Sequence, residues 1–155
     1  MKYLILLILS ISTTRSHAQW NLVPNPSFED TLNCDSFQIY HAGFPWFTPT
    51  NCTPDYYYGL NPNCGNSAFQ NPTGFQMPFD GDAYVGIFLA KPITGFGTRE
   101  YISVELTDSL ISGEDYQLEF YVSRSNKYYL ATDDIAALFS VNLLSWSGCT
   151  YLPYQ

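Results

Sequence analysis

The sequence predicts an all-β fold: an antiparallel β-sandwich of the jelly-roll kind that is incomplete at its C-terminal end. Three observations support this prediction. Apolar and polar residues alternate along residues 99–106 and 115–123, β-branched and aromatic residues are frequent in both segments, and turn-forming residues separate them. No segment has a convincing helical period, since residues 106–111 offer one turn at most.

Regular strands are expected in the second half of the chain, after a first half that is rich in loops. Residues 20–80 contain many Pro, Asn and Gly residues, which break helices and keep strands short. The chain ends soon after its last candidate strand, so we expect a fragment of a longer product. Short candidate strands cover residues 20–23, 37–41 and 75–77, and longer ones cover residues 83–89, 99–106, 115–123 and 135–144.

The N-terminal residues are expected to be a signal peptide. Lys2 precedes an apolar run over residues 3–11, and Ser16-His17-Ala18 fits a cleavage site. The run is too short to span a bilayer, and no later segment is long and apolar enough. We therefore expect export to the periplasm, the outer-membrane surface or the medium, with residues 1–18 removed and residues 19–155 forming one β-sandwich domain.

The charge balance narrows the class of partners. The chain carries 6 basic and 14 acidic residues, a net charge of −8 at pH 7. Lys2 and Arg15 lie in the signal peptide, so the mature chain is more acidic still. So few cations argue against nucleic acid and anionic lipid as partners, because both present phosphates. Cations and neutral ligands such as polysaccharides are compatible with this charge.

Catalytic groups are scarce, and we predict that the chain is not an enzyme. His41 is the single histidine after the signal peptide, and no Gly-x-Ser-x-Gly motif accompanies it to suggest a triad. Glu100, Glu105 and Glu119 fall on predicted strands, where nothing marks two of them as a facing pair for glycoside hydrolysis. All four are better interpreted as ordinary loop and strand residues.

Aromatic residues in loops are the best candidates for a ligand site. Sugars stack their C–H faces on flat rings, while polar side chains reach their hydroxyls. Trp46, Tyr57 and Tyr58 lie in a loop-rich region, and Tyr128 and Tyr129 lie in a second loop. Aromatic side chains also fill loop-rich cores, so packing is the alternative, above all for Trp46. We predict glycan contact among these residues, with Tyr57 or Tyr58 preferred.

Four cysteines lie after the signal peptide, where an oxidising compartment makes disulfides the expected state. Free thiols are the alternative, and three pairings are open. Zinc is disfavoured because no Cys-x-x-Cys pair is present and His41 is the one histidine outside the signal peptide. The four residues are Cys34, Cys52, Cys64 and Cys149, and nothing in their pattern requires a cofactor.

Ordered motifs run along nearly the whole mature chain. They are Asn21-Leu-Val-Pro-Asn-Pro-Ser-Phe-Glu29, Pro45-Trp46-Phe47-x-Pro49-Thr50, Thr53-Pro-Asp-Tyr56, Gly74-Phe-Gln76, Gly81-x-Ala-Tyr-x-Gly-Ile87, Arg99-Glu-Tyr-Ile102, Leu110-x-x-Gly113 and Tyr121-Val-Ser123. Together these motifs resemble a family of secreted proteins from the Bacteroidetes. The resemblance implies a galactose-binding-like jelly roll, akin to modules appended to polysaccharide hydrolases. Such a module commonly precedes an outer-membrane-protein-A-like domain or a sorting domain for type IX secretion.

The resemblance also implies particular covalent links. Its cysteine spacing suggests a Cys34–Cys64 disulfide, which would staple the loop-rich half of the chain. Cys52 and Cys149 would then form a second pair or remain free. The competing pair is Cys52–Cys64, which is shorter in sequence.

A structural calcium ion is a further implication of the resemblance. In related jelly rolls calcium ties the Asn-Pro-Ser-Phe-Glu segment to the final strand, whereas Asp133 and Asp134 match the middle strand of the family pattern; carboxylates are its usual ligands. Glu29 and Asp30 match the first half of such a site, and the acidic pair Asp133 and Asp134 opens a predicted strand. The alternative is that these are turn and loop acids without a metal.

The favoured hypothesis is a non-catalytic, exported module that binds glycan or another cell-envelope component. One alternative is a purely structural or adhesin-like surface domain. Another is an accessory fragment of a secreted hydrolase. Fold class alone does not choose among them, because one fold serves many functions.

Overall fold

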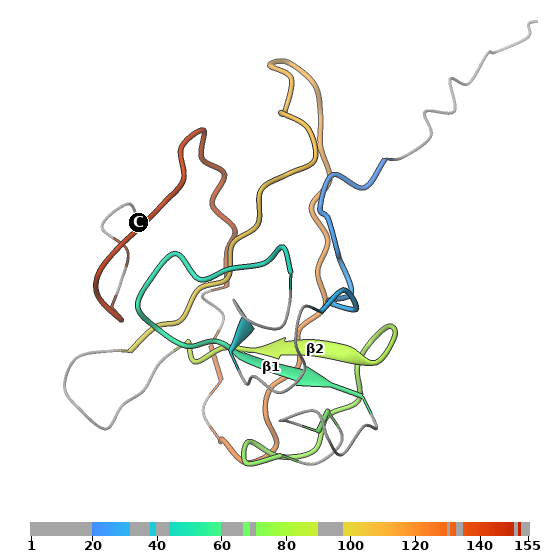
Figure 1. The fold of residues 1–155 in the computed structure, drawn as a ribbon, viewed down its shortest axis with the longest axis vertical. Helices are drawn as coiled ribbons and strands as arrows, with labels where there is room; N and C mark the ends of the chain where they lie inside the picture. Colours follow the sequence, from blue (N-terminus) through green and yellow to red (C-terminus); the bar gives the residue numbers. More distant parts are fainter. Residues whose placement is uncertain are drawn as a thin grey trace, which may run out of the picture.

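The structure is a computed structural model, and it describes residues 20–31, 38–39, 44–59, 67–68, 71–89, 98–129, 131–132, 135–150 and 152. Two β-strands are the regular elements of this part: β1, Asp55–Tyr58, and β2, Ala83–Gly86. They pair antiparallel at the centre of the molecule, with Tyr57 opposite Tyr84 (Figure 1). This agrees with the all-β class. The predicted signal peptide, residues 1–18, lies outside the described residues.

Strand β1 lies in a segment for which the sequence predicted only loops, and this is a correction. Its three tyrosines favour extended backbone and place alternate rings on opposite faces. The rings of Tyr56 and Tyr58 stack on one face at a centroid distance of 6.2 Å, and Tyr57 stacks on Tyr84 at 4.8 Å on the other. Both faces of the strand are therefore covered by aromatic side chains.

Strand β2 confirms the first part of the candidate strand 83–89. It follows an Asp80-Gly81-Asp82 turn in which Gly81 has a φ of 63°, a backbone conformation that glycine adopts readily. Behind the turn, the backbone N–H of Gly59 donates to the carbonyl of Asp82 at 2.5 Å. This hydrogen bond joins the residue that follows β1 to the residue that precedes β2 and so extends the pairing by one position.

The core surrounds β1. The largest fully buried side chains are Tyr56, Tyr57, Ile39 and Pro54, and Ala83 packs against Tyr56 together with partly buried Phe28. Most of the buried residues come from the first half of the chain, the half with the weaker strand signals. Strand β1 and the loops around it thus supply the core.

Isolated β-bridges hold further extended segments in place. The backbones of Phe47 and Ser103 exchange two hydrogen bonds, at 2.9 and 2.8 Å, and Thr50 bridges Trp146. Gln38 bridges Asp55 on the edge of β1. Within the candidate strand 99–106, Ser103 forms a bridge, and Arg99 and Glu100 donate single backbone hydrogen bonds to Cys149 and Phe88. That prediction is therefore realised as isolated contacts and not as a paired strand.

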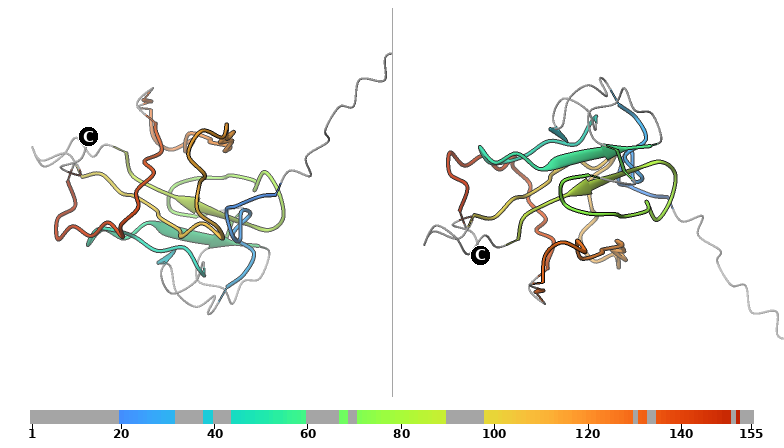
Figure 2. Two further views of the ribbon diagram at one scale, coloured as in Figure 1. Left: turned by 90° about the horizontal axis from the view of Figure 1, so that it is seen from above. Right: turned by 90° about the horizontal axis from the view of Figure 1, so that it is seen from below.

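Residues 115–123 and 135–144 run without strand pairing, which differs from the sequence prediction. Their apolar side chains are exposed: Tyr121 is 60% exposed and Val141 is 99% exposed. The physical reason is that alternation defines the two faces of a strand but supplies no neighbour to receive its hydrogen bonds. Figure 2 shows these orange-to-red segments reaching out on one side of the β1–β2 pair.

Two of the three short candidate strands are not realised, and the third lies mostly outside the described residues, with Gln38 in the bridge to Asp55. Residues 20–23 and 75–77 form no ladder, and of residues 37–41 the structure describes two, Gln38 and Ile39. No helix in the described ranges combines the length and the apolar character that crossing a membrane requires.

Candidate functional site

The Asn-Pro-Ser-Phe-Glu segment, residues 25–29, forms a structural turn. The side chain of Asn25 donates to the carbonyls of Asp30 and Phe44, at 3.0 and 2.6 Å, and accepts from the backbone N–H of Asp30 at 3.0 Å. Asn25 and Phe28 both have positive φ, at 43° and 63°, and the Phe28 N–H donates to the Asn25 carbonyl. The asparagine thus replaces missing backbone partners and fixes the turn.

Glu29 caps the beginning of β2. Its Oε1 accepts from the backbone N–H groups of Asp82 and Ala83, at 2.8 and 2.9 Å. A Cβ placed on Gly81 would overlap this carboxylate, which explains the glycine at that position. Nearby, Ser27 donates to a carboxylate oxygen of Asp80 at 2.8 Å. The carboxylate of Glu29 therefore has a structural role as a hydrogen-bond acceptor.

The predicted calcium site stays a prediction. Glu29 uses one oxygen on two backbone N–H groups, and Asp30 is exposed. Asp133 and Asp134 lie outside the described residues. Among the residues that the structure describes, no group of three or more His, Cys, Asp or Glu side chains is arranged to hold a metal ion.

Trp46 packs into the turn and is only partly exposed. Its ring lies 5.0 Å from that of Phe28, tilted by 45°, and its indole N–H donates to the Asn25 carbonyl at 2.9 Å. The hydroxyl of Tyr56 donates to the Phe28 carbonyl at 2.7 Å from the other side. The packing alternative considered for Trp46 is the one that the structure supports.

Tyr57, one of the two preferred glycan contacts, is buried, so the expectation that its ring is exposed is wrong. It is 2% exposed, with its hydroxyl 3.2 Å from Thr73 Oγ1 and 3.3 Å from the carboxylate of Asp55. Burial is the main cause that raises the pKa of both Tyr57 and Asp55. The physical reason for the error is that Tyr84 covers the face that the sequence left open. Tyr58 is partly buried, stacked on Tyr56.

A surface hollow lies below the sheet, where residues 71–75 meet residues 126–127. Its volume is about 320 Å³, and its lining comprises Asn71, Gly74, Phe75, Asn126 and Lys127. We call it the 71–75 hollow. Pockets that bind small ligands have volumes of this order or larger.

The floor of the 71–75 hollow is a tight turn closed by backbone hydrogen bonds. Asn71 and Gly74 exchange N–H···O bonds of 3.0 and 3.1 Å. The Asn71 side chain donates to the Ser67 carbonyl and to the hydroxyl of Tyr84, and it accepts from Thr73. Because Asn71 is buried and fully bonded, its role is to anchor the turn to β2.

The opposite wall comes from the loop of residues 125–129. Lys127 Nζ donates to the carbonyls of Asn71 and Pro72, at 3.3 and 3.0 Å. Asn126 Oδ1 accepts from the Phe75 N–H at 3.1 Å, and a Cβ on Gly74 would overlap that amide. Two segments 50 residues apart are thus joined by side-chain to backbone hydrogen bonds, which gives the hollow a fixed shape.

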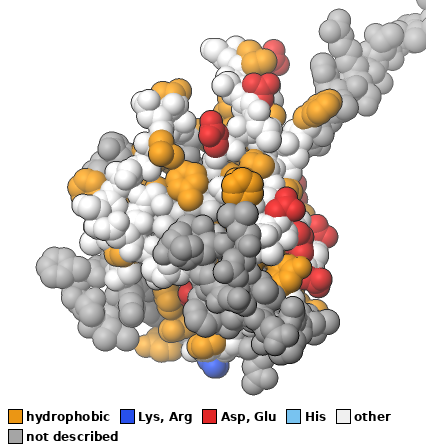
Figure 3. Space-filling view, viewed as in Figure 1, with side chains coloured by type: hydrophobic (Ala, Val, Ile, Leu, Met, Phe, Trp, Pro, Cys, Tyr) orange, Lys and Arg blue, Asp and Glu red, His pale blue; other side chains and the backbone are white. Residues whose placement is uncertain are grey.

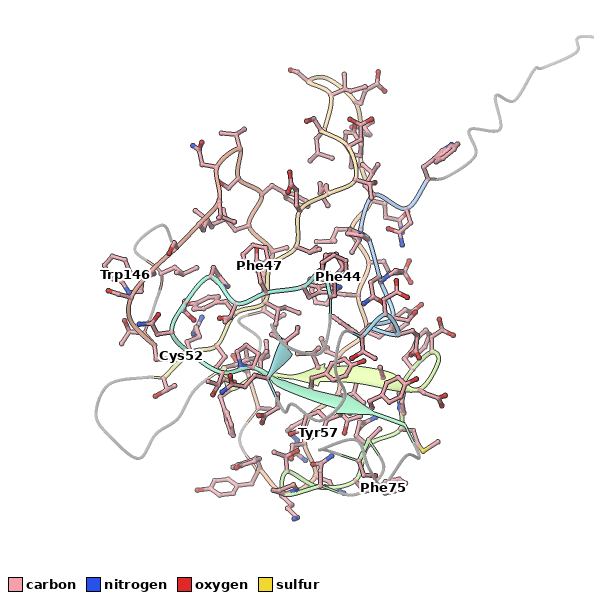
Figure 4. The ribbon with its side chains drawn as sticks, in the orientation of Figure 1. Phe44, Phe47, Cys52, Tyr57, Phe75 and Trp146 are labelled. Atoms are coloured by element: carbon pink, nitrogen blue, oxygen red, sulfur yellow. A yellow bond between two sulfur atoms is a disulfide. The ribbon has the colours of Figure 1, made fainter. Side chains whose placement is uncertain are left out.

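Phe75 is an exposed ring in the lining of the 71–75 hollow. It is 56% exposed and lies at the lower edge of the molecule (Figure 4). Tyr128 and Tyr129 directly follow Lys127 and are 48% and 89% exposed, and Tyr128 contacts Phe88 edge-on at 5.6 Å. The sequence identified this tyrosine pair but missed Phe75, Asn126 and Lys127. The Asn-Pro-Thr-Gly turn at residues 71–74 was the available signal.

The structure describes three of the four remaining candidates for catalysis. Glu100 is buried and accepts from the Phe88 N–H at 2.8 Å, whereas Glu119 accepts from the hydroxyl of Tyr121 at 2.7 Å. Glu105 is exposed, and His41 lies outside the described residues. The hydrogen bonds of Glu100 and Glu119 are therefore made with different residues, Phe88 and Tyr121.

Cys52 and Cys149 form a disulfide with a Cα–Cα distance of 5.1 Å. It is the second pair that the sequence considered, and it excludes the competing Cys52–Cys64 link. Cys34 and Cys64 lie outside the described residues. The bond fastens the end of the described chain to the loop that precedes β1.

Acidic side chains predominate over basic ones on the face shown in Figure 3, where apolar side chains also reach the surface. This agrees with the net charge of −8. No protein-family model, no curated protein and no solved structure matches this chain.

Proposed function

We propose that this chain is an exported, non-catalytic β-sandwich module that binds neutral glycan at the 71–75 hollow. The observation that carries the proposal is the juxtaposition of an exposed ring, Phe75, with the amide of Asn126 and the ammonium group of Lys127 around a hollow of about 320 Å³. The β1–β2 pair is interpreted as the ordered centre of the sandwich.

The chemistry of these groups matches the two kinds of surface on a sugar. The face of Phe75 offers an apolar platform for C–H groups. Asn126 uses its amide oxygen on the Phe75 N–H, and its amide nitrogen retains donor capacity toward a hydroxyl. Lys127 has three N–H donors, of which two serve backbone carbonyls. One ring and two kinds of donor therefore converge on the hollow.

Charge favours a neutral glycan over an anionic one. The chain has 14 acidic and 6 basic residues, so its field repels polyanions at low ionic strength. Lys127 is the charged donor at the hollow, but its ammonium group is engaged by two carbonyls. Neutral hexose polymers satisfy the donors without opposing the overall charge.

Binding to arrays of neutral polysaccharides, with purified protein spanning residues 19–155, tests the proposal. Phe75→Ala is expected to weaken binding about tenfold, the effect of one aromatic contact. Phe139→Ala is the matched control, because Phe139 is 54% exposed against 56% for Phe75 and does not line the hollow. Equal loss in both variants, or no binding by the unmodified protein, would overturn the proposal.

A second function, a structural or adhesin-like surface domain, is favoured by a different observation. Apolar side chains of residues 116–122 and 135–143 lie exposed, Val141 at 99% and Leu143 at 78%. Apolar surface of this kind marks sites of protein association. A chain that binds no glycan and self-associates through Val141 and Leu143 would support this second function in place of the first.

A further inference from the structure

The segment that leaves the 71–75 hollow carries a row of exposed apolar side chains. Phe75, Met77 and Phe79 are 56%, 52% and 70% exposed, whereas Gln76 and Pro78 between them are partly buried. This alternation places every second side chain on the solvent face. Side chains two positions apart on an extended chain are separated by roughly 7 Å, so the row extends roughly 13 Å from Phe75.

Contacts with residues 119–123 hold this row in position. Phe79 stacks on Tyr121 at a centroid distance of 3.4 Å and an interplanar angle of 12°. Gln76 Oε1 accepts from the hydroxyl of Ser123 at 2.7 Å. Tyr121 is itself 60% exposed, so the stacked pair widens the row and does not bury it. We call this surface the aromatic strip, after three of its four residues, and it comprises Phe75, Met77, Phe79 and Tyr121.

Polar groups border the aromatic strip. Glu119 accepts from the hydroxyl of Tyr121 at 2.7 Å, and Asp80 follows Phe79 directly and accepts from Ser27 at 2.8 Å. Carboxylates are acceptors for sugar hydroxyls, and they oppose the approach of an anionic surface. An apolar row between acidic groups therefore fits a long neutral ligand that presents both C–H faces and hydroxyls.

We propose that the glycan is a linear, neutral polysaccharide chain that lies along the aromatic strip, with one sugar unit in the 71–75 hollow and further units on Phe79 and Tyr121. This inference rests on the proposed function and specifies its ligand class. A module that recognises a single terminal sugar uses the hollow alone, whereas the strip gives binding sites to several consecutive units.

The test measures affinity against chain length by titration calorimetry. The probes are neutral β-1,4-glucan, β-1,3-glucan and β-1,4-mannan oligosaccharides, each from the disaccharide to the hexasaccharide. Affinity is expected to rise about tenfold or more across the series, because each stacked unit adds an aromatic contact. Phe79→Ala and Tyr121→Ala are each expected to weaken hexasaccharide binding about tenfold and leave disaccharide binding unchanged.

The variants separate the two levels of the proposal. Phe75→Ala is expected to weaken binding at every chain length, and Phe139→Ala at none. Affinity that does not depend on length, or a Phe79→Ala protein with unchanged hexasaccharide affinity, overturns the strip and leaves the hollow intact. Failure of the unmodified protein to bind any probe overturns both. Far-ultraviolet circular dichroism checks that each exposed-site variant retains its fold.

Discussion

Strand β1 and residues 115–123 have similar compositions and opposite surroundings. Each contains three aromatic residues after an aspartate: Tyr56 to Tyr58 follow Asp55, and Tyr116, Phe120 and Tyr121 follow Asp115. Yet Tyr56 and Tyr57 are each 2% exposed, whereas Tyr121 is 60% exposed. The difference teaches that a strand-like pattern determines which side chains share a face, while burial requires partners from elsewhere in the chain.

Polar side chains supply those partners in the first half of the chain. Glu29 caps the start of β2, Asn25 fixes the turn that carries Phe28, and Asn71 ties a loop to Tyr84. Each uses hydrogen bonds from a side chain to replace a missing strand neighbour. In the second half, the side chains of Glu100, Asn126 and Lys127 act in the same way, but they lie outside the strand-like residues 115–122.

Replacing the buried tyrosine is expected to give the largest effect. Tyr57→Ala removes a ring that is stacked on Tyr84 and leaves a cavity, so we expect a loss of about 3–5 kcal/mol in the free energy of unfolding. Tyr121→Ala, on the exposed segment, is expected to cost less than about 1 kcal/mol. Urea unfolding followed by fluorescence measures both. Similar losses at the two positions would contradict the contrast between the regions.

Removing the cap of β2 is expected to give the next largest effect. Glu29→Ala leaves the N–H groups of Asp82 and Ala83 without their charged acceptor, at an expected cost of about 2–3 kcal/mol. Glu114→Ala is the control, since Glu114 is an exposed acid in the turn of residues 111–114. Thermal unfolding of both variants gives the comparison. If Glu29 mainly binds calcium, its loss will cost stability only when calcium is present.

Alkaline pH is expected to destabilise the first region selectively. Burial is the main cause that raises the pKa of Tyr56 and Tyr57 above the value of 10.0 for an unfolded chain. The folded state therefore keeps these protons when the unfolded state releases them. Their contribution to stability is complete below pH 10 and is lost as pH rises further, by up to about 1.4 kcal/mol per pH unit for each residue.

Unfolding midpoints between pH 8 and pH 11.5 check this expectation. Tyr57→Phe should flatten the alkaline decline, because phenylalanine carries no ionisable hydroxyl. A decline of the same steepness in Tyr57→Phe would show that other groups control it. Absorbance of tyrosinate reports the ionisation directly, and the buried tyrosines should ionise only as the protein unfolds.

The smallest expected effect is a difference in amide hydrogen-exchange rate between the two regions, measured without any substitution. The amides of Tyr57 and Tyr84 face each other across the β1–β2 pair, in register with the Gly59–Asp82 hydrogen bond, and should exchange slowly. Those of residues 115–123 and 135–140 should exchange close to the rate of an unfolded chain, because these residues form no ladder. Peptide-resolved mass spectrometry measures this. Strong protection over residues 115–123 would indicate a strand partner for that segment.

The sequence predicted the all-β class and the position of β2, because Ala83 to Gly86 follows a clear Asp-Gly turn. It missed β1, since Pro54 and Gly59 flank a run of only four residues. The exposure of Tyr57 was misjudged because alternation does not reveal that Tyr84 lies opposite.

The candidate site was predicted in part for a similar reason. Tyr128 and Tyr129 stand out in a loop, and both are exposed. Phe75 and Lys127 join one hollow through hydrogen bonds between side chains and backbone, and such bonds leave no periodic pattern in the sequence. A contact between segments some 50 residues apart becomes apparent only when the chain is folded.

The Cys52–Cys149 disulfide makes a covalent ring of the chain between these residues, which are separated by 97 positions. Both strands and the 71–75 hollow lie inside that ring. A protease that cuts once within the exposed residues 115–123 therefore releases no fragment under oxidising conditions. The nicked molecule would migrate as one species on a non-reducing gel and separate after reduction of the bond. In a protease-rich surrounding, the two halves of the site would thus stay tethered after a cut.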